Sequence, residues 1–212
     1  NLAVNATANF ADNFSPAISY GADGAGSTGY SLALSGANVN SGLYALGVGG
    51  AAGAQIVLNQ AGNVITGSVG GTDYFTIAIN TATGVVTFDQ LAAVYHSSTA
   101  SADDTSTLSA AANALVLRAT VTDADGDVAT HNLDLGTAGA FNIEDDGPVI
   151  TSANVAAIDT LTLDETTLTG SVTANFADNF ATAISYGTDG AGTTAYTLVL
   201  TGSNVASGLY AL

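Results

Sequence analysis

Hydrophobic and polar residues alternate in short runs along most of the chain, which is the pattern of half-buried β-strands. These runs lie at residues 30–34, 55–58, 63–66, 74–79, 85–88, 115–122, 131–135 and 141–143. Turn-forming residues separate the runs, and the stretch at 80–84 predicts a hairpin between its neighbours. Only residues 90–96, with Asp89 as a candidate N-cap, favour a helix. The pattern therefore predicts an all-β fold, an antiparallel β-sandwich.

An internal repeat determines the expected organisation of the chain. Residues 7–46 return at residues 173–212, an offset of 166, with 30 of the 40 aligned positions identical. Solenoid repeats are about 20 to 50 residues long, so a period of this length leaves room for a core in each unit. We expect a window of a longer tandem array. Its predicted parts are one repeat lacking its first few residues at 1–149, a linker at 150–162 and the start of the next repeat at 163–212.

The charge balance limits the possible partners. The chain has 18 acidic residues, one basic residue (Arg118) and no Lys, for a net charge of −17. Such a surface repels phosphate backbones and anionic headgroups, so we expect neither nucleic-acid binding nor electrostatic attachment to membranes. The sequence has no apolar run of 18 residues, so we expect no direct membrane insertion. The absence of Cys excludes disulfides, thiolate zinc sites and Cys nucleophiles. Metal cations are the partners that this charge attracts.

The acidic residues gather in clusters. The motif DADGD places Asp123, Asp125 and Asp127 at an expected hairpin tip, and the other clusters are Glu144, Asp145 and Asp146, then Asp164 and Glu165, and Asp103 and Asp104. Carboxylates this close repel one another unless a cation lies between them, and oxygen ligands on a Gly-containing loop suit Ca²⁺. We predict calcium ligands at these positions, with a solvated acidic tip as the alternative. An EF-hand is not expected, because Gly126 is the fourth residue of the loop rather than the sixth and strands flank it.

Other acids have two interpretations each. Asp23 and its copy Asp189 are either further calcium ligands or residues of a simple loop, and Asp12 and Asp178 either cap a turn or bind metal. Carboxylates on both sides of residues 149–162 are expected to share calcium and to stiffen the joint between repeats.

Enzymatic chemistry has little support in the sequence. His96 and His131 have no companions that suggest a catalytic site, and no GxSxG motif is present. The Gly-rich stretch at 21–26 lacks the Lys of a P-loop, and an aromatic platform beside paired carboxylates is not evident. We therefore expect no enzyme activity.

Taken in order, the motifs LDET, TANFADNF, TATGVVTFDQLAAVYH, VTDADGDVATHNLDLG and IEDDGPV resemble the tandem extender repeats of giant RTX-type adhesins that Gram-negative bacteria secrete by the type I route. The resemblance covers nearly the whole period. It implies calcium-rich, often Ig-like β-sandwich modules on the bacterial cell surface, with a role in cell adhesion and biofilm formation. It also implies that Asp123, Asp125 and Asp127, with Asp145 and Asp146, are the calcium ligands. The chain has no GGxGxDxUx nonapeptide, and this absence fits a repeat from the stalk of such an adhesin.

The expected partners are neighbouring repeats of the same chain. The alternative is a subunit of a self-assembling extracellular filament or surface layer, with calcium at contacts between chains. Extensive strand pairing between molecules would favour assembly, whereas end-to-end contact alone would favour a stalk.

Overall fold

The computed structural model describes residues 5–154 and 158–210. The chain divides into two compact units, unit 1 (Asn1–Gly147) and unit 2 (Pro148–Leu212). The predicted end of the first repeat, at residue 149, lies two residues beyond this division, and residues 155–157 of the predicted linker lie outside the described residues. Among the described residues, no helix is long and apolar enough to cross a membrane.

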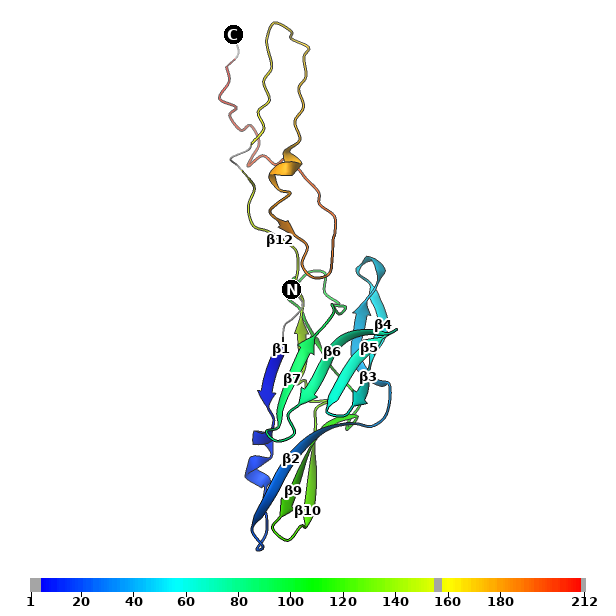
Figure 1. Ribbon diagram of the computed structural model, residues 1–212. Coiled ribbons are helices and arrows are strands. Elements are labelled where there is room, and N and C mark those ends of the chain that lie inside the picture. Colours follow the sequence, from blue (N-terminus) through cyan, green and yellow to red (C-terminus); the bar gives the residue numbers. More distant parts are fainter. Residues whose placement is uncertain (1–4, 155–157, 211–212) are drawn as a thin grey trace. The chain divides into compact units, whose positions relative to one another are not determined.

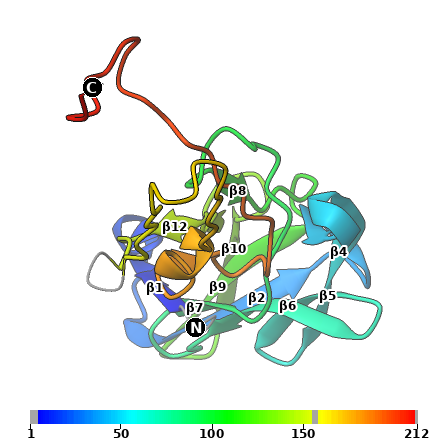
Figure 2. The ribbon, with the colours of Figure 1, turned by 90° about the horizontal axis from the view of Figure 1, so that it is seen from above.

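The larger sheet of unit 1 has six antiparallel strands in the order β1-β7-β6-β5-β4-β3 and is curled into a half-barrel (Figure 1; Figure 2). The strands are β1 (Asn5–Asn9), β3 (Val39–Leu46), β4 (Ala52–Ala61), β5 (Val64–Val69), β6 (Thr72–Ile79) and β7 (Val85–Gln90). Consecutive strands from β4 to β7 pair as neighbours, which confirms the predicted hairpin at residues 80–84.

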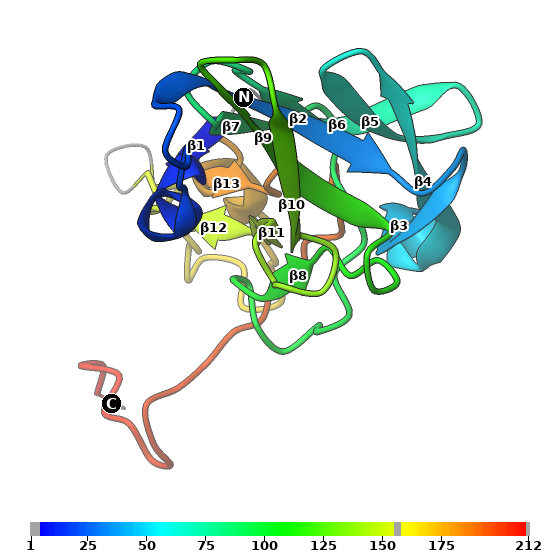
Figure 3. The same cartoon turned by 90° about the horizontal axis from the view of Figure 1, so that it is seen from below.

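The smaller sheet has the order β10-β9-β2 and consists of β2 (Ala25–Leu34), β9 (Leu115–Asp123) and β10 (Val128–Asp134) (Figure 3). A separate pair is formed by β8 (Thr105–Thr107) and β11 (Asn142–Glu144). Short 3-10 turns lie at η1 (Ala11–Asn13), η2 (Ser15–Ala17) and η3 (Val48–Gly50). The predicted all-β, antiparallel class is therefore confirmed.

Both sheets bury their apolar side chains in one core. Strand β6 alternates as its sequence predicts, with Phe75, Ile77 and Ile79 buried, while β9 contributes Leu117 and β2 contributes Leu32 to the same cluster. Burying one such side chain stabilises the fold by about 1.5–3 kcal/mol. The two sheets are therefore held together mainly by this shared apolar contact.

In the described part of the first 46 residues, which is residues 5–46, all strands are edge strands of the two sheets. Strands β1 and β3 are the two edges of the six-stranded sheet, and β2 is an edge of the three-stranded sheet. Their partners are β7, β4 and β9, all later in the chain. The Gln60 side chain of β4 also binds β2, because its amide donates to the Leu32 carbonyl at 2.7 Å and its oxygen accepts from the Leu34 N–H at 2.9 Å.

The predicted helix at 90–96 is wrong. Strand β7 continues to Gln90, and the amides of Leu91 and Ala92 donate to the carbonyl of Tyr74 at 2.7 and 3.1 Å. Val94 is buried and forms a β-bridge with Ala45. These backbone groups bond to other strands, so the i→i−4 bonds of a helix do not form.

Unit 2 repeats the local structure of the start of unit 1. It contains β12 (Val149–Ile150), which pairs with β13 (Ile184–Ser185), and the 3-10 helix η5 (Phe176–Asn179). The rings of Phe180 and Tyr196 lie 5.8 Å apart, as those of Phe14 and Tyr30 lie 6.1 Å apart. Within the described part of unit 2, however, residues 191–210 form no strand.

One carboxylate joins two loops of unit 1. Asp134 Oδ2 accepts from the Asn113 N–H and the Thr137 hydroxyl, each at 2.9 Å, and Oδ1 accepts from the Gly136 N–H at 2.9 Å. These bonds lower the pKa of Asp134 below its usual value of 3.8; the Asn113 amide is the largest cause, and partial desolvation acts in the opposite direction.

This pKa shift predicts a pH dependence of stability. The pKa of Asp134 is lower in the folded than in the unfolded chain. The ionised carboxylate therefore adds to the free energy of unfolding above pH 3.8, and this addition is lost as the pH falls through the pKa of the folded state. We expect Asp134→Asn to lower the free energy of unfolding at pH 6 and to flatten the decline below pH 3.8. Urea unfolding followed by circular dichroism measures this, and an unchanged pH slope would contradict it.

The contact between Gly67 and Phe75 predicts a second effect on stability. Gly67 lies opposite Phe75 in the β5–β6 pairing, and a Cβ there would lie 2.3 Å from the fully buried Phe75 ring. Because the ring has no free space, we expect Gly67→Ala to lower the free energy of unfolding by about 1–3 kcal/mol.

Gly29→Ala is the matched control for this substitution. A Cβ at Gly29 would meet only the Thr81 carbonyl, at 3.9 Å. We expect its effect to stay within about 0.5 kcal/mol. Equal destabilisation by the two substitutions in urea unfolding would contradict the packing argument.

Candidate metal centre

The acidic motif forms the tip of the β9–β10 hairpin. Asp123 Oδ1 accepts hydrogen bonds from the backbone amides of Gly126 and Asp127, at 3.1 and 2.8 Å, and the Asp123 N–H donates to the Asp127 carbonyl at 3.0 Å. Gly126 has φ +104°, a conformation that side chains rarely adopt. The tip therefore has a defined shape that fixes the Asp123 carboxylate.

A second acidic residue reaches this tip from a distant part of the sequence. Strand β2 pairs with β9 so that Ala25 lies opposite Asp123, with a bulge between Ala25 and Ser27, and the Ala124 N–H donates to the Gly24 carbonyl at 3.2 Å. A Cβ at Gly26 would lie 2.4 Å from the Asp123 carbonyl oxygen, so this close approach requires glycine. The loop before β2, which carries Asp23, is thus held against the hairpin tip.

Three carboxylates meet at this place. Asp23, Asp123 and Asp125 each offer an oxygen, and the three oxygens lie within 4.8 Å of one another; Asp123 is half-buried and the other two are exposed. Asp127 is outside this group, although with Asp123 it lines an adjacent depression of about 190 Å³. The structure therefore groups Asp123 and Asp125 of the DADGD motif with Asp23, which the sequence predicted as either a further calcium ligand or a residue of a simple loop.

The charge of this acidic triad has no basic side chain to neutralise it. The hydrogen bond with Asp125 is the largest cause that lowers the pKa of Asp123; the amides of Asp127, Gly126 and Asp125 add to it, and partial burial opposes it. Arg118, the single basic residue, donates its Nε–H to Asn132 Oδ1 at 3.0 Å. A bound cation would relieve the repulsion among the three carboxylates.

Two other predicted clusters come together in unit 1. The β8–β11 pairing continues beyond the strands, because the Asp145 N–H donates to the Asp104 carbonyl at 2.9 Å and the Gly147 N–H donates to the Ala102 carbonyl at 3.1 Å. This places five acids on adjacent segments: Asp103, Asp104, Glu144, Asp145 and Asp146. In the described chain, however, the triad is the one group of three carboxylates close enough to share an ion.

Asp104 is the most enclosed member of this second group. Its Oδ2 accepts from the Ser98 N–H at 3.3 Å, while its Oδ1 is buried without a hydrogen-bond partner among the described residues. Such an oxygen is costly to bury, and this marks Asp104 as the residue of the group that most needs a partner.

The remaining predicted cluster lies in unit 2. Asp164 Oδ1 accepts from the N–H and the hydroxyl of Thr166, at 2.9 and 2.7 Å, and these bonds lower its pKa. Glu165 is exposed in the same turn. The sharing of calcium across residues 149–162 stays a prediction.

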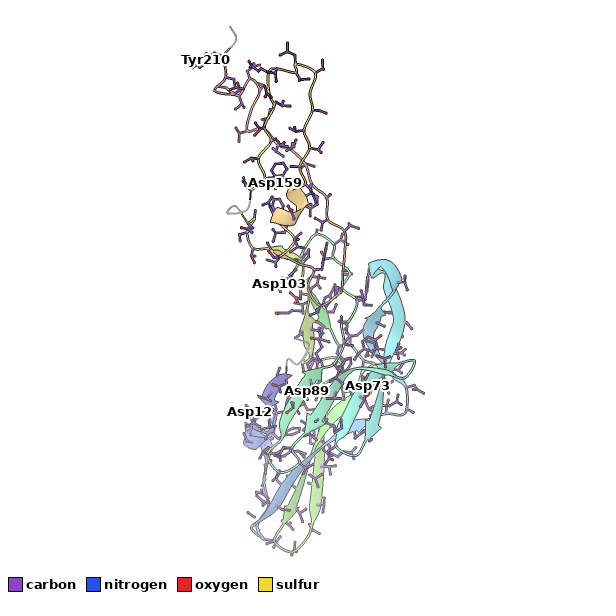
Figure 4. All side chains as sticks on the ribbon, turned by 45° about the horizontal axis from the view of Figure 1, so that its top comes forward. Asp12, Asp73, Asp89, Asp103, Asp159 and Tyr210 are labelled. Carbon is purple, nitrogen blue, oxygen red and sulfur yellow. The ribbon has the colours of Figure 1, made fainter. Side chains whose placement is uncertain are left out.

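The other polar candidates have local contacts. Asn175 is the N-cap of the turn that contains Asp178, because its Oδ1 accepts from the Ala177 amide at 3.1 Å. Near Asp12, Asn9 Oδ1 accepts from the Ala11 amide at 3.0 Å. Figure 4 shows Asp12, Asp73, Asp89 and Asp103 at separate places in unit 1. His96 Nδ1 lies 3.3 Å from the Ser106 hydroxyl, and the His131 ring packs edge-on against Phe14 at 6.5 Å.

Comparison with known proteins shows a family. No curated protein and no solved structure matches the chain. A family model matches residues 1–136 and 160–212, which are most of the chain and include parts of both units. The chain therefore belongs to the family described as "Domain of unknown function (DUF5801)".

Proposed function

We propose that the chain is a non-enzymatic, calcium-stabilised structural repeat from the stalk of a bacterial cell-surface adhesin, which acts in cell adhesion and biofilm formation outside the cell. The observation that carries the proposal is the acidic triad, where three carboxylate oxygens converge within 4.8 Å. These carboxylates come from two loops, distant in sequence, that the β2–β9 pairing brings together. An ion held there fastens the start of the repeat to its later part.

The chemistry of the triad favours calcium. Ca²⁺ takes six to eight oxygen ligands in flexible geometry, and carboxylates, backbone carbonyls and water all serve. Asp23 and Asp125 are exposed, so water has access to the remaining coordination positions. Sites of this open kind suit the millimolar calcium found outside cells.

The repeat gives this charge a structural role. Residues 47–212 are one period of 166 and carry 16 acids with Arg118, a net charge of −15 that recurs in every repeat of the proposed array. Without cations, neighbouring repeats repel one another through this charge. Calcium bound at each repeat removes part of the repulsion, which makes an extended stalk stable only where calcium is present.

We also propose that unit 1 is an Ig-like sandwich module. The support is that two antiparallel sheets share one core and that β2 and β3 connect one sheet to the other. Its sheets of six and three strands differ from the four and three of the constant-type Ig domain, so the likeness concerns the layered packing.

Calcium titration of the full chain tests the proposal. We expect Kd values of about 10⁻⁴–10⁻³ M. At 10 mM Ca²⁺, one such site raises the free energy of unfolding by about 1.4–2.7 kcal/mol. Asp23→Asn combined with Asp125→Asn should remove one bound ion in calorimetry and most of the calcium-dependent rise in melting temperature of unit 1.

The matched control is Asp73→Asn, an exposed acid on β6 outside the triad. It changes the net charge in the same direction and should leave calcium binding almost unaltered. If the triad variant binds the same number of ions as the natural chain, the triad is not a calcium site and the proposal loses its main support.

A further inference from the structure

The stretch that connects two repeats folds with the repeat that follows it. Unit 2 begins at Pro148, so it includes residues 149–154, which precede the repeated segment. In these residues β12 pairs antiparallel with β13, and Ile150 lies opposite Ile184 (Figure 3). The first part of the predicted linker at 150–162 therefore has a strand partner within the next repeat.

Further hydrogen bonds continue this contact beyond the two strands. The Thr151 N–H donates to the Ala183 carbonyl at 3.1 Å, and the Asn154 N–H donates to the Asn179 carbonyl at 2.7 Å. The Asn179 side chain donates to the Asn154 carbonyl at 2.8 Å. We call residues 149–154 the linker segment. The residues that it bonds to or pairs with form the seat, which consists of Asn179, Ala183, Ile184 and Ser185.

Unit 1 has the same seat, but its polar groups are open. The four aligned residues are identical in the two copies, and in unit 1 they are Asn13, Ala17, Ile18 and Ser19. Asn179 is only 6% exposed, whereas Asn13 belongs to the exposed residues. In the described part of unit 1, no amide from outside the short turns donates to the carbonyl of Asn13 or Ala17. The seat that carries a linker segment thus buries its asparagine, and the other seat does not.

The seat of unit 1 forms one wall of a hollow. The hollow has a volume of about 330 Å³, and all four seat residues line it together with Phe14. The opposite wall comes from β9 and β10 and consists of Ala119, Val121, Ala129, Thr130 and His131. Most of these side chains are apolar, while the seat offers free backbone groups. Such a site suits an extended segment that pairs through its backbone and directs an apolar side chain inward.

Ile150 is the side chain of the linker segment that suits this hollow. In unit 2 it lines the same apolar surface as Phe180 and Ile184, whose counterparts Phe14 and Ile18 line the hollow of unit 1. Against the seat alone, Ile150 remains 61% exposed. The β9–β10 wall of unit 1 gives such a side chain a second apolar surface, so burial there is favourable.

We propose that the linker segment of the preceding repeat occupies the hollow of unit 1, where it pairs with Ile18 and Ser19. Its isoleucine then lies between Phe14 and the β9–β10 hairpin. The proposal rests on the tandem array of the proposed function, in which every repeat follows a linker segment. The partner of this surface is therefore another part of the same protein, recognised by backbone pairing and one apolar side chain.

This assignment shortens the connection between repeats. Gly147 still belongs to unit 1, where its N–H donates to the Ala102 carbonyl at 3.1 Å, and Val149 is the first residue of β12. Pro148 alone stands between them, and its ring restricts its own φ. A connection of one restricted residue couples successive repeats through backbone bonds and packing, and this coupling does not require calcium.

A chain with an added linker tests the proposal. Residue 1 aligns with residue 167, so a second copy of residues 148–166 placed directly before Asn1 restores the order of the array. We call this addition the linker copy. The natural sequence has no Cys, and Val149 pairs with Ser185 in unit 2, which is the counterpart of Ser19. Paired residues of antiparallel strands have Cα atoms about 4.5–5.5 Å apart, within disulfide range.

The expected result is a disulfide within one chain. Val149→Cys in the linker copy with Ser19→Cys should lose both free thiols under oxidation in chelator, and peptide mass spectrometry should identify the bond. Ile150→Asp in the linker copy should lower the yield about tenfold or more, because a carboxylate without a partner is costly to bury. A yield that Ile150→Asp leaves unchanged would overturn the proposal.

Two controls make this result specific. Val48→Cys in place of Ser19→Cys puts the second thiol on a fully exposed residue of η3 outside the seat, and it should give little cross-link. Equal yields from the two positions would show that the linker copy does not choose the seat. Val149→Cys with Ser185→Cys, without the linker copy, should close within unit 2, and its failure would remove the pairing on which the proposal depends.

A variant without cysteine gives an independent measurement. Asn13→Ala should lower the melting temperature of unit 1 in the chain with the linker copy, because it removes the amide that would bond to the linker carbonyl. In the chain without the linker copy, where Asn13 is exposed, the melting temperature should change little. The same change in both chains would contradict docking. All these measurements are made in chelator, so they can fail while calcium titration of the triad succeeds, and the reverse.

Discussion

The antiparallel pairing of β2 with β9 is the contact on which the rest of unit 1 depends. It joins the start of the chain to a strand whose paired residues lie 81 (Leu34 with Leu115) to 98 (Ala25 with Asp123) positions later, and it sets Leu32 beside Leu117 in the core that the two sheets share. Its last pair, Ala25 with Asp123, places the loop of Asp23 against the acidic hairpin tip. Packing and the candidate metal centre therefore have the same origin: if the register slipped by one residue, both would be lost.

Sequence patterns predicted the strands best where one face is buried. The run at 74–79 became part of β6 with its apolar residues inward, because alternation reports burial directly. The helix at 90–96 was wrong, since local propensity does not show that the amides of Leu91 and Ala92 bond to Tyr74. Strand β8 carries only Thr105–Thr107 and has no apolar alternation to reveal it.

The sequence predicted the kind of ligand that the candidate site would bind, but not all of the residues that form the site. Clustered carboxylates pointed to a cation, and the DADGD motif does lie at a hairpin tip. Spacing along the chain predicted a site of Asp123, Asp125 and Asp127. In the fold, Asp123 and Asp125 instead lie close to Asp23, which is far away in sequence. One sequence feature could have indicated that Asp23 lies near Asp123. Gly26 permits the close approach of its strand to the backbone of Asp123, and the second copy of the segment has glycine at the same place, Gly192.

The edge-strand position of β1, β2 and β3 also affects how a repeat folds during synthesis. Strands β1, β2 and β3 pair with β7, β9 and β4, so none of them has its partner until much more of the chain has left the ribosome. Contacts this distant in sequence form slowly. During that delay a nearly identical neighbouring segment competes for the same places, and misassembly between neighbours is a known hazard of repeat proteins. In each repeat, the segment that carries β1, β2 and β3 is synthesised before β4, β7 and β9. It is therefore already present when these partner strands emerge, which favours pairing within the repeat.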